Sequence, residues 1–294
     1  MLSSPDQTGG ATLKHLSLTA AFLLAGLSSG LCGVARAEGI ACPTDPRAPA
    51  HTPTVELPAR GGAAYGTMQY AKGQMLGPKE IALTFDDGPD PKTTERVLDI
   101  LDRHCIKATF FMVGWYAHAR PDLVREVAAR GHTIGTHTWF HPNNLRHLPG
   151  PEAKHEISKG FAAVEAALAS APPESQARLA PFFRFPGLND EKALRSWLGA
   201  RNIATVSCDF GADDWLKISS AQVYKRALVN IDQIGRGILI LHDTKPHTAD
   251  MLSDLIVTLE KRGYRFVQLV PEKNGRTLAA NAPDALIGQT HSLQ

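Results

Sequence analysis

Two neighbouring aspartates, Asp86 and Asp87, follow directly on a short apolar run, IALTF, that has the composition of a buried strand. Adjacent carboxylates repel each other, and a buried carboxylate loses its water, so the pair needs a cation or hydrogen-bond donors as compensation. A turn or helix-cap role before Gly88-Pro89 accounts for one aspartate better than for two. The pair therefore indicates a site in which acids carry out chemistry.

The sequence HTWFH places two histidines, His137 and His141, four positions apart. If this segment forms a helical turn, both rings lie on one face and can hold a single ion. An HxxxH pair alone is weak evidence in a chain with 12 histidines, but a carboxylate from another strand end completes a set that leaves one position for water. Because successive strand residues point in different directions, one aspartate can bind the ion while the other takes a proton from water.

Two further polar residues stand in apolar surroundings: Arg184 within FFRFP, and His242 after GILIL. An arginine keeps its charge, so at a buried position it needs a carboxylate partner, although a surface arginine after a strand is an equally simple interpretation. A histidine at the end of a buried strand is more often a hydrogen-bonded core ring than a catalyst. A nearby acid strengthens the catalytic interpretation, because a carboxylate orients an imidazole and raises its pKa.

The segment DFGADDW offers three acids for this purpose, Asp209, Asp213 and Asp214. Its spacing leaves open which of them partners the histidine, and adjacency to Trp215 favours Asp214. The indole of Trp215 could form a flat apolar wall for a sugar or an acyl group. Packing in the core is an equally simple role for it.

From about residue 80 to 270, short apolar runs alternate with amphipathic stretches, which predicts βαβ units and a parallel sheet. Pro121 at one helix start, and Gly131 and Gly263 after two helix ends, support the boundaries. We expect an α/β fold with about seven parallel strands, arranged as a deformed or incomplete (β/α) barrel. No GxGxxG follows the first strand, which argues against a dinucleotide-binding sheet. Catalytic groups gather at the carboxyl ends of parallel strands, where the unusual polar residues of this chain also fall.

The two ends of the chain are predicted to lie outside this fold. Residues 1–37 have the basic start, apolar run and Ala35-Arg36-Ala37 cleavage site of a secretory signal peptide, with an uncleaved membrane anchor as the alternative. Residues 38–79, rich in Pro, Gly, Ala and Thr, are expected to form a loosely structured N-terminal extension, and 271–294 a C-terminal tail. A cleaved signal predicts a secreted or periplasmic protein without a membrane partner.

Composition excludes several classes of protein. With 294 residues, 43% hydrophobic and 20% charged, the chain is an ordinary globular protein, and its net charge of +2 gives no electrostatic case for nucleic acid. Three cysteines follow the predicted cleavage site, Cys42, Cys105 and Cys208, without a CxxC pair. Cys105 and Cys208 lie in apolar segments and are expected to be buried thiols, with one disulfide as an open alternative.

The order of motifs resembles that of the polysaccharide deacetylases of carbohydrate esterase family 4, also called the NodB homology domain. The motifs are TFDDGP at 84–89, HTWFH at 137–141, RFPG at 184–187, DW at 214–215 and LHD at 241–243. The resemblance covers about residues 78 to 270, so we place the deacetylase domain at 80–270. The combination of TFDDGP with HTxxH is highly specific. Two departures stand out: Gly187-Leu188 replaces a common aromatic residue, and DFGADDW is one residue longer than usual.

The resemblance implies a role for each matching residue. Asp86 is the expected catalytic base, and Arg184 holds it in its ionised form. His242 is the expected general acid, and Asp214 is its partner. The expected metal ligands are Asp87, His137 and His141. The implied substrate-binding positions are the backbone N–H of Gly187, which serves the oxyanion, and Trp215 and the side chains of the ILIL strand, Leu241 among them, which line the acetyl pocket. The implied cofactor is a divalent metal, zinc by preference, with cobalt or manganese as alternatives.

The implied function is removal of N-acetyl groups from a polysaccharide containing N-acetylglucosamine: peptidoglycan, chitin oligomers or an exopolysaccharide. We expect a monomer whose partner is an acetylated polysaccharide or oligosaccharide. The alternatives are an O-acetyl esterase acting on xylan, a non-catalytic carbohydrate-binding relative, and a relative that cleaves a non-sugar C–N bond. Substrate choice is expected to depend on the loops at 143–155 and 171–181.

Overall fold

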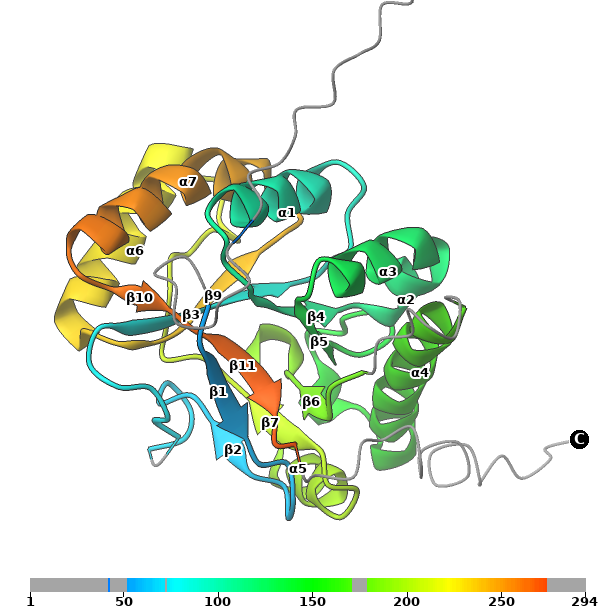
Figure 1. Cartoon of the computed structure of the whole chain (residues 1–294). Coiled ribbons are helices and arrows are strands. Elements are labelled where there is room, and N and C mark those ends of the chain that lie inside the picture. The colour runs from blue at the N-terminus through cyan, green and yellow to red at the C-terminus, as the bar shows by residue number, and fades with distance from the viewer. Residues whose placement is uncertain (1–41, 43–51, 72, 171–178, 274–294) are drawn as a thin grey trace, which may run out of the picture. The chain divides into compact units, whose positions relative to one another are not determined.

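The computed structural model describes residues 42, 52–71, 73–170 and 179–273. The predicted signal peptide, most of the tail from 271 and most of the loop at 171–181 lie outside these ranges. In the described part, strands and helices alternate along the chain, as the sequence pattern predicts (Figure 1). No helix of that part is long and apolar enough to cross a membrane.

The strands have two to seven residues each. They are β1 (Thr54–Leu57), β2 (Ala64–Tyr65), β3 (Glu80–Asp86), β4 (Thr109–Met112), β5 (Thr133–Thr136), β6 (Phe182–Phe183), β7 (Ala204–Val206), β8 (Phe210–Gly211), β9 (Gly237–His242), β10 (Arg265–Phe266) and β11 (Gln268–Pro271). Those at the centre of the main sheet, β3 to β7, are fully buried. All seven predicted strands are present, the last of them divided between β10 and β11.

The main sheet has nine strands, in the order β2-β7-β6-β5-β4-β3-β9-β8 with β10 also paired to β3, and every pairing is parallel. The sheet curls into an incomplete barrel, which confirms the predicted fold class. A second, two-stranded parallel sheet joins β1 to β11. The fold thus brings the carboxyl ends of strands that are distant in sequence to one rim.

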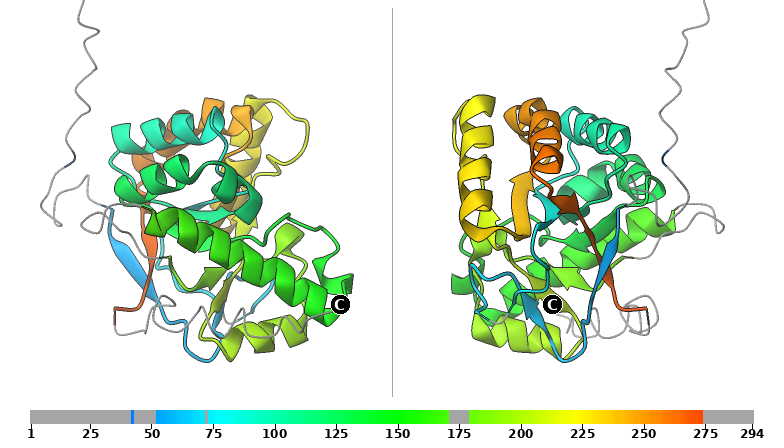
Figure 2. Two further views of the ribbon diagram at one scale, coloured as in Figure 1. Left: turned by 90° about the vertical axis from the view of Figure 1, so that its right-hand side faces the viewer. Right: turned by 60° about the vertical axis from the view of Figure 1, so that its left-hand side comes forward.

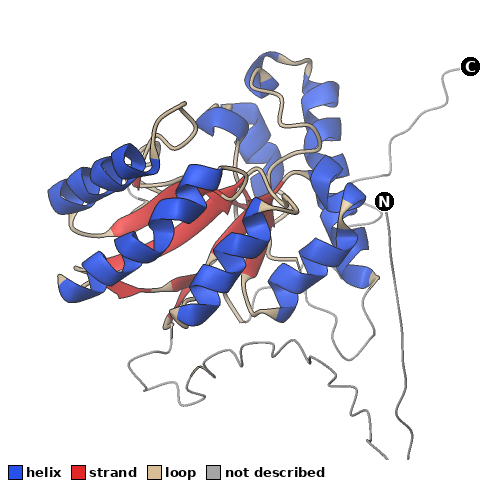
Figure 3. Cartoon of the chain, turned by 90° about the horizontal axis from the view of Figure 1, so that it is seen from above, coloured by secondary structure: helices blue, strands red, loops and turns tan. Residues whose placement is uncertain are grey.

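The helices lie outside the curled sheet (Figures 1 and 3). They are α1 (Thr93–Arg103), α2 (Gly114–Ala119), α3 (Pro121–Ala129), α4 (Gly150–Ala169), α5 (Lys192–Gly199), α6 (Ser220–Ile234) and α7 (Pro246–Lys261), with short 3-10 turns η1 (Leu145–His147) and η3 (Pro186–Leu188). Helices α6, α7 and α1 pack side by side (Figure 2). The short helix α2 was not predicted from the sequence.

Alternation along the strands separates two cores. In β3, Ile81, Leu83 and Phe85 face the helices and pack in the larger hydrophobic cluster. The residue between the first two, Ala82, belongs to the cluster inside the barrel. Because side chains alternate with a period of two, Thr84 and Asp86 point to that inner side as well. A carboxylate therefore enters the barrel interior at the rim.

The N-terminal extension differs from the expectation. Residues 52–79 were expected to be loosely structured, but they include β1 and β2, and Leu57, Tyr65 and Leu76 are buried in the inner cluster. Strand β2 extends the main sheet beside β7, and β1 pairs with the last strand of the fold. The sequence signal is weak because two- and four-residue strands are too short to show alternation.

The cysteines also depart in part from the expectation. Cys105 is not a free thiol but is bonded to Cys42, across a separation of 63 residues, with Cα atoms 5.4 Å apart. The disulfide connects residue 42 to the turn after α1. Cys208 is a free and buried thiol, as predicted. Burial raises its pKa to about 12, so it is unreactive.

Candidate active site

The rim of the barrel collects polar residues from five strand ends. The parallel register of β3 and β9 pairs Asp86 with His242, so the two residues lie at the same height on neighbouring strands. His137 follows β5, and Arg184 follows β6. Asp214 lies shortly after β8. The structure thus brings together the acids, histidines and arginine that the sequence analysis singled out.

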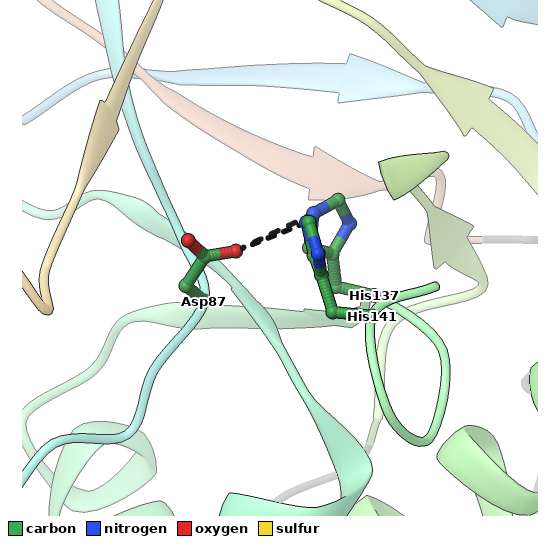
Figure 4. A group of neighbouring side chains, drawn as sticks. All are labelled: Asp87, His137 and His141. Atoms are coloured by element: carbon green, nitrogen blue, oxygen red, sulfur yellow. Dashed lines mark ion pairs between the residues drawn. The ribbon is translucent and has the colours of Figure 1, made fainter. Parts of the chain in front are cut away.

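Asp87, His137 and His141 form a compact group of ligand atoms (Figure 4). The Oδ1 atom of Asp87 lies 3.3 Å from Nε2 of His141 and 3.8 Å from Nε2 of His137, and the ligand atoms all lie within 4.8 Å of one another. This Oδ1 atom is buried and has no hydrogen-bond partner among the described residues. A buried carboxylate oxygen without a donor facing it, beside two imidazoles, fits a divalent cation.

The two histidines do not lie on a helix, contrary to the helical turn considered from their spacing. The HTWFH segment is a loop in which Thr138 and His141 have positive φ values of 67° and 56°. The N–H of His141 donates to Oγ1 of Thr138 at 3.0 Å, which closes the turn. Glycine is required on α4 beside this loop, because a Cβ at Gly160 would lie 2.5 Å from the carbonyl carbon of Thr138.

The imidazole of His137 is held in a definite orientation. Its Nδ1 lies 2.8 Å from the carbonyl oxygen of Arg184, so Nδ1 carries the proton and Nε2 presents its lone pair. The ring is fully buried, and burial lowers its pKa to about 3, with the neighbouring His141 adding to the effect. His137 is therefore neutral at ordinary pH, which is the form that binds a metal.

Asp86 and Arg184 form a buried ion pair. The Nη1 atom of Arg184 donates to Oδ1 of Asp86 at 2.7 Å, and both side chains are shielded from solvent. Burial raises the pKa of Asp86, and the positive charge and hydrogen bond of Arg184 oppose this rise. The other carboxylate oxygen of Asp86 lies 3.7 Å from Nε2 of His137, so Asp86 stands directly beside the expected metal ligands.

The guanidinium of Arg184 is satisfied on every side. Its Nε donates to the carbonyl of Val206 at 2.9 Å, and its Nη2 donates to the carbonyl of Ser207 at 2.8 Å. Nη1 also donates to Oγ1 of Thr84, and the guanidinium lies 4.1 Å from the centroid of the Phe111 ring. Such a network fixes the orientation of the arginine and therefore of the carboxylate that it holds.

His242 pairs with Asp214 across the rim. Nδ1 of His242 lies 2.8 Å from Oδ1 of Asp214, and the backbone N–H of His242 donates to Oδ2 at 2.7 Å. Burial alone would lower the pKa of His242, but the hydrogen bond and charge of Asp214 outweigh it and raise the pKa to about 9. His242 therefore carries a proton at neutral pH and can donate it.

The two other candidate acids have different partners. Asp213 forms a salt bridge with Arg226 at 2.6 Å on the exposed side of α6. Asp209 accepts hydrogen bonds from the backbone and hydroxyl of Thr67 and from the backbone of Ile238. Of the three acids between which the sequence could not decide, Asp214 is therefore the one that partners His242.

The predicted wall of the acetyl pocket is only partly brought to the site. Trp215 is 63% exposed next to Asp214, so it is not a core residue. Leu241 does not reach the site: it is fully buried and packs with the helices in the outer cluster. The alternation of β9 instead turns Ile240 to the inner side, where it packs against the inner cluster and stays partly exposed. Gly187 has a φ of 57° within η3.

Several residues that position the site were not predicted from the sequence. Thr84 could have been found, because it lies two residues before Asp86 and so shares its face. Thr248, at the start of α7, donates to Oδ2 of Asp214 at 2.6 Å. Asp243 is buried against the loop after Asp87, where a Cβ on Gly88 would lie 2.1 Å from its Oδ2. Tertiary packing creates the contacts of Thr248 and Asp243, and no local sequence pattern indicates them.

Comparison with known proteins places this geometry in a family. The family profile "Polysaccharide deacetylase" matches residues 73–199, a range that includes the metal-ligand group, Asp86 and Arg184. A peptidoglycan-N-acetylglucosamine deacetylase from Bacillus cereus is 33% identical over 195 residues, which are 65% of this chain and 66% of that protein. A chitooligosaccharide deacetylase from Bradyrhizobium is 31% identical over 208 residues, 66% of this chain and 90% of that protein.

Solved structures agree with the sequence comparison. A peptidoglycan deacetylase from Bdellovibrio bacteriovorus superimposes with a TM-score of 0.67 and 29% identity, over 79% of this chain and 62% of that one. This chain therefore spans less than two thirds of that protein, and about two thirds of the Bacillus cereus relative. The matching motifs, the curled parallel sheet and these relatives lead to one conclusion. The chain belongs to the polysaccharide deacetylase family.

Proposed function

We propose that this chain is a secreted, metal-dependent deacetylase that hydrolyses N-acetyl groups of a polysaccharide containing N-acetylglucosamine. Membership of the family assigns it to the hydrolases that act on carbon–nitrogen bonds other than peptide bonds. The observation that carries the proposal is the division of labour between two adjacent acids. Asp87 faces two imidazoles with an unpartnered oxygen, whereas Asp86 is held by a buried arginine 2.7 Å away.

Asp87, His137 and His141 are the residues proposed to hold the metal, with zinc preferred because two imidazoles and one carboxylate suit it. When bound, the ion polarises the acetyl carbonyl and lowers the pKa of a water molecule. Three protein ligands leave room for such a water, whereas a closed structural site would use four. The chelator and metal-content experiments below test this assignment.

Asp86 and His242 are the proposed proton carriers. The carboxylate of Asp86 takes a proton from the attacking water, whose oxygen adds to the acetamide carbonyl carbon. The backbone N–H of Gly187 is proposed to donate to the resulting oxyanion. His242 then gives its proton to the departing nitrogen, the C–N bond breaks, and acetate and a free amine leave. Base and acid are needed together, so activity requires Asp86 ionised and His242 protonated.

The wall of the acetyl pocket is proposed to consist of Trp215 and Ile240. Trp215 is exposed and follows Asp214 directly in the chain. Ile240 lies two residues before His242 on the inner face of β9. This assignment replaces Leu241, which faces the helices. Apolar side chains at this place suit the methyl group of an acetyl.

The relatives guide the choice of substrate. Those named above are deacetylases of N-acetylglucosamine in peptidoglycan and of chitooligosaccharides. Together with the signal-like residues 1–37, they support a secreted or periplasmic enzyme acting on one of these glycans. We propose N-acetylglucosamine residues of peptidoglycan or chitin oligomers as the substrate class.

Acetate release tests the proposal directly. The protein is assayed on N-acetylglucosamine oligomers, peptidoglycan and acetylated xylan, before and after treatment with a chelator, and again after zinc is restored. We expect release from the first two, loss of release with the chelator, and recovery with zinc. Absence of acetate release from every N-acetylated glycan by zinc-loaded protein would refute the function.

A further inference from the structure

Three aromatic side chains form a cluster next to the proposed metal ligands. Trp115 is the second residue of α2, and Trp139 and Phe140 belong to the loop between His137 and His141. The ring centroids of Trp115 and Phe140 lie 5.4 Å apart with planes tilted by 35°, and Trp115 meets Trp139 edge to face at 5.7 Å. Trp139 and Phe140 are 5.4 Å apart. We call Trp115, Trp139 and Phe140 the aromatic platform.

The platform has a buried base and an exposed surface. Trp139 is only 6% exposed, whereas Trp115 is 46% and Phe140 is 57% exposed. Two large neighbouring aromatic rings left half in water cost free energy, and contiguous exposed apolar surface of this kind marks binding sites. In the described part of the chain, each of these exposed rings touches the other and the buried indole below.

The backbone that carries the platform is held in place. The N–H of Gly114 donates to the carbonyl of Thr138 at 2.8 Å, and that of Trp115 donates to the carbonyl of Trp139 at 3.0 Å. A Cβ at Gly114 would lie 2.8 Å from the Cα of Gly160, so α2 and α4 pack closely, backbone against backbone. A ligand therefore does not need to order this backbone, which reduces the entropic cost of binding.

Charges of both signs lie beside the platform. Nζ of Lys159 lies 4.1 Å from the Trp139 centroid and 5.9 Å from that of Phe140. The carboxylate of Glu156 accepts a hydrogen bond from the N–H of Phe140 at 3.0 Å. These two flanking charges are opposite in sign, and the centroid of the His118 ring lies 5.9 Å from that of Trp139, so several polar groups border the rings. This combination suits a neutral ligand with apolar C–H faces and hydroxyl groups, which is the chemistry of a pyranose ring.

We propose that the aromatic platform binds a sugar ring of the glycan chain next to the residue that is deacetylated. Phe140 immediately precedes the proposed ligand His141, so one loop carries both a ring of the platform and a ligand of the metal site, and in this proposal one glycan chain reaches both. The C–H face of the sugar packs on Phe140 and Trp115. This inference rests on the proposed function, and it makes the platform a determinant of preference for longer oligomers.

Kinetics on substrates of two lengths test the platform. Phe140→Ala and Trp115→Ala are compared with wild type on the N-acetylglucosamine monomer and hexamer. Aromatic contacts of this kind contribute about twofold to tenfold each, so kcat/KM on the hexamer is expected to fall by about that factor per ring, mainly through KM. Activity on the monomer, which cannot fill both places, stays close to wild type. Phe140→Tyr keeps the ring and restores hexamer activity.

Tyr116 provides a matched control. It follows Trp115 on α2 and is 47% exposed, yet among the described residues it makes no ring contact with the platform. Tyr116→Ala is expected to leave the monomer-to-hexamer ratio of kcat/KM unchanged. If Phe140→Ala and Trp115→Ala lower monomer and hexamer activity equally, or change neither, the platform does not bind glycan. If they instead change only the oligomeric state in size-exclusion chromatography, a second copy of the chain occupies the platform and the proposal is wrong.

A binding experiment separates this inference from the proposed function. Hexamer binding is measured by calorimetry in zinc-loaded Asp86→Asn protein, with and without Phe140→Ala. We expect Phe140→Ala to weaken binding by the factor seen in KM. Equal binding by both proteins overturns the platform and leaves the deacetylase function intact. If neither protein binds the hexamer and wild type releases no acetate from it, the proposed function itself fails.

Discussion

Replacing Asp214 by asparagine is expected to move the alkaline limit of activity by more than two pH units. In the wild type, burial lowers the pKa of His242, but the hydrogen bond and charge of Asp214 raise it to about 9. The increase from the ordinary value of 6.5 corresponds to roughly 3 kcal/mol of preference for the imidazolium. An asparagine side chain is nearly isosteric with aspartate but uncharged, so in the variant burial dominates and the pKa of His242 falls below 6.5.

The size of the effect follows from the fraction of protonated imidazole. At pH 8 about nine tenths of the wild-type His242 carries its proton, but at most about 3% does in Asp214→Asn, so the rate falls by at least about 30-fold at that pH. The assay is kcat/KM for acetate release from N-acetylglucosamine hexamer between pH 5 and pH 10, with metal content checked at each end. The asparagine variant should recover towards pH 5 to 6, until protonation of Asp86 limits it. An alkaline limit that remains near pH 9 in Asp214→Asn would refute the assignment of His242 as the acid.

Stability gives an independent readout of the same pair. The folded-state pKa of His242 lies above its unfolded value, so the pair's contribution is complete below about pH 6.5 and is lost as pH rises through about 9. Urea unfolding of the wild type should therefore show a declining free energy of unfolding across this window. Asp214→Asn should lack that decline, and an equal decline in both proteins would contradict the coupling.

Three further substitutions probe other parts of the structure. Cys42→Ser removes the disulfide to Cys105, which closes a loop of 63 residues. Because the unfolded chain then gains loop entropy, the free energy of unfolding in urea should fall by about 4 kcal/mol. A loss below about 1 kcal/mol would contradict a structural role of the disulfide. Arg184→Met leaves Asp86 buried and unpaired, so the free energy of unfolding should fall by about 3–5 kcal/mol. The loss should be smaller in the double variant in which Asp86 is also changed to Asn. Equal losses in the single and double variants would argue against the ion pair. Ile240→Ala enlarges the proposed acetyl pocket, so the ratio of kcat/KM for N-propionyl over N-acetyl hexamer should rise, and an unchanged ratio would exclude this wall.

The sequence indicated the proposed metal ligands and the proposed base because the signal of these residues is local. TFDDGP and HTWFH each place reactive groups within a few positions, and the strand before Asp86 fixes which side each acid faces. The conformation of HTWFH was not predictable in the same way. Spacing of four suggested a helical turn, but the loop uses positive φ at Thr138 and His141 and is braced by a glycine on α4, a contact from a distant segment.

Other features depended on long-range contacts. Asp209, Asp213 and Asp214 look alike in sequence, and only their partners in space distinguish them. The disulfide of Cys42 joins a segment without periodicity to the end of α1, so neither neighbourhood indicated it. The resemblance assigned the side chains of the ILIL strand, Leu241 among them, to the acetyl pocket, whereas alternation along β9 turns Ile240 to the inner side and Leu241 to the helices.

The central claim is that Asp86 and Asp87, though adjacent, have different roles, and metal content measured beside activity tests it most directly. Asp86→Asn and Asp87→Asn are purified, exposed to zinc, desalted, and analysed for bound zinc and for acetate release from N-acetylglucosamine hexamer. We predict that Asp86→Asn retains one zinc per chain while its rate falls by about 10²–10⁴, and that Asp87→Asn loses the zinc together with the activity. Loss of zinc from both variants to the same extent, or a near-wild-type rate in Asp86→Asn, would contradict the account.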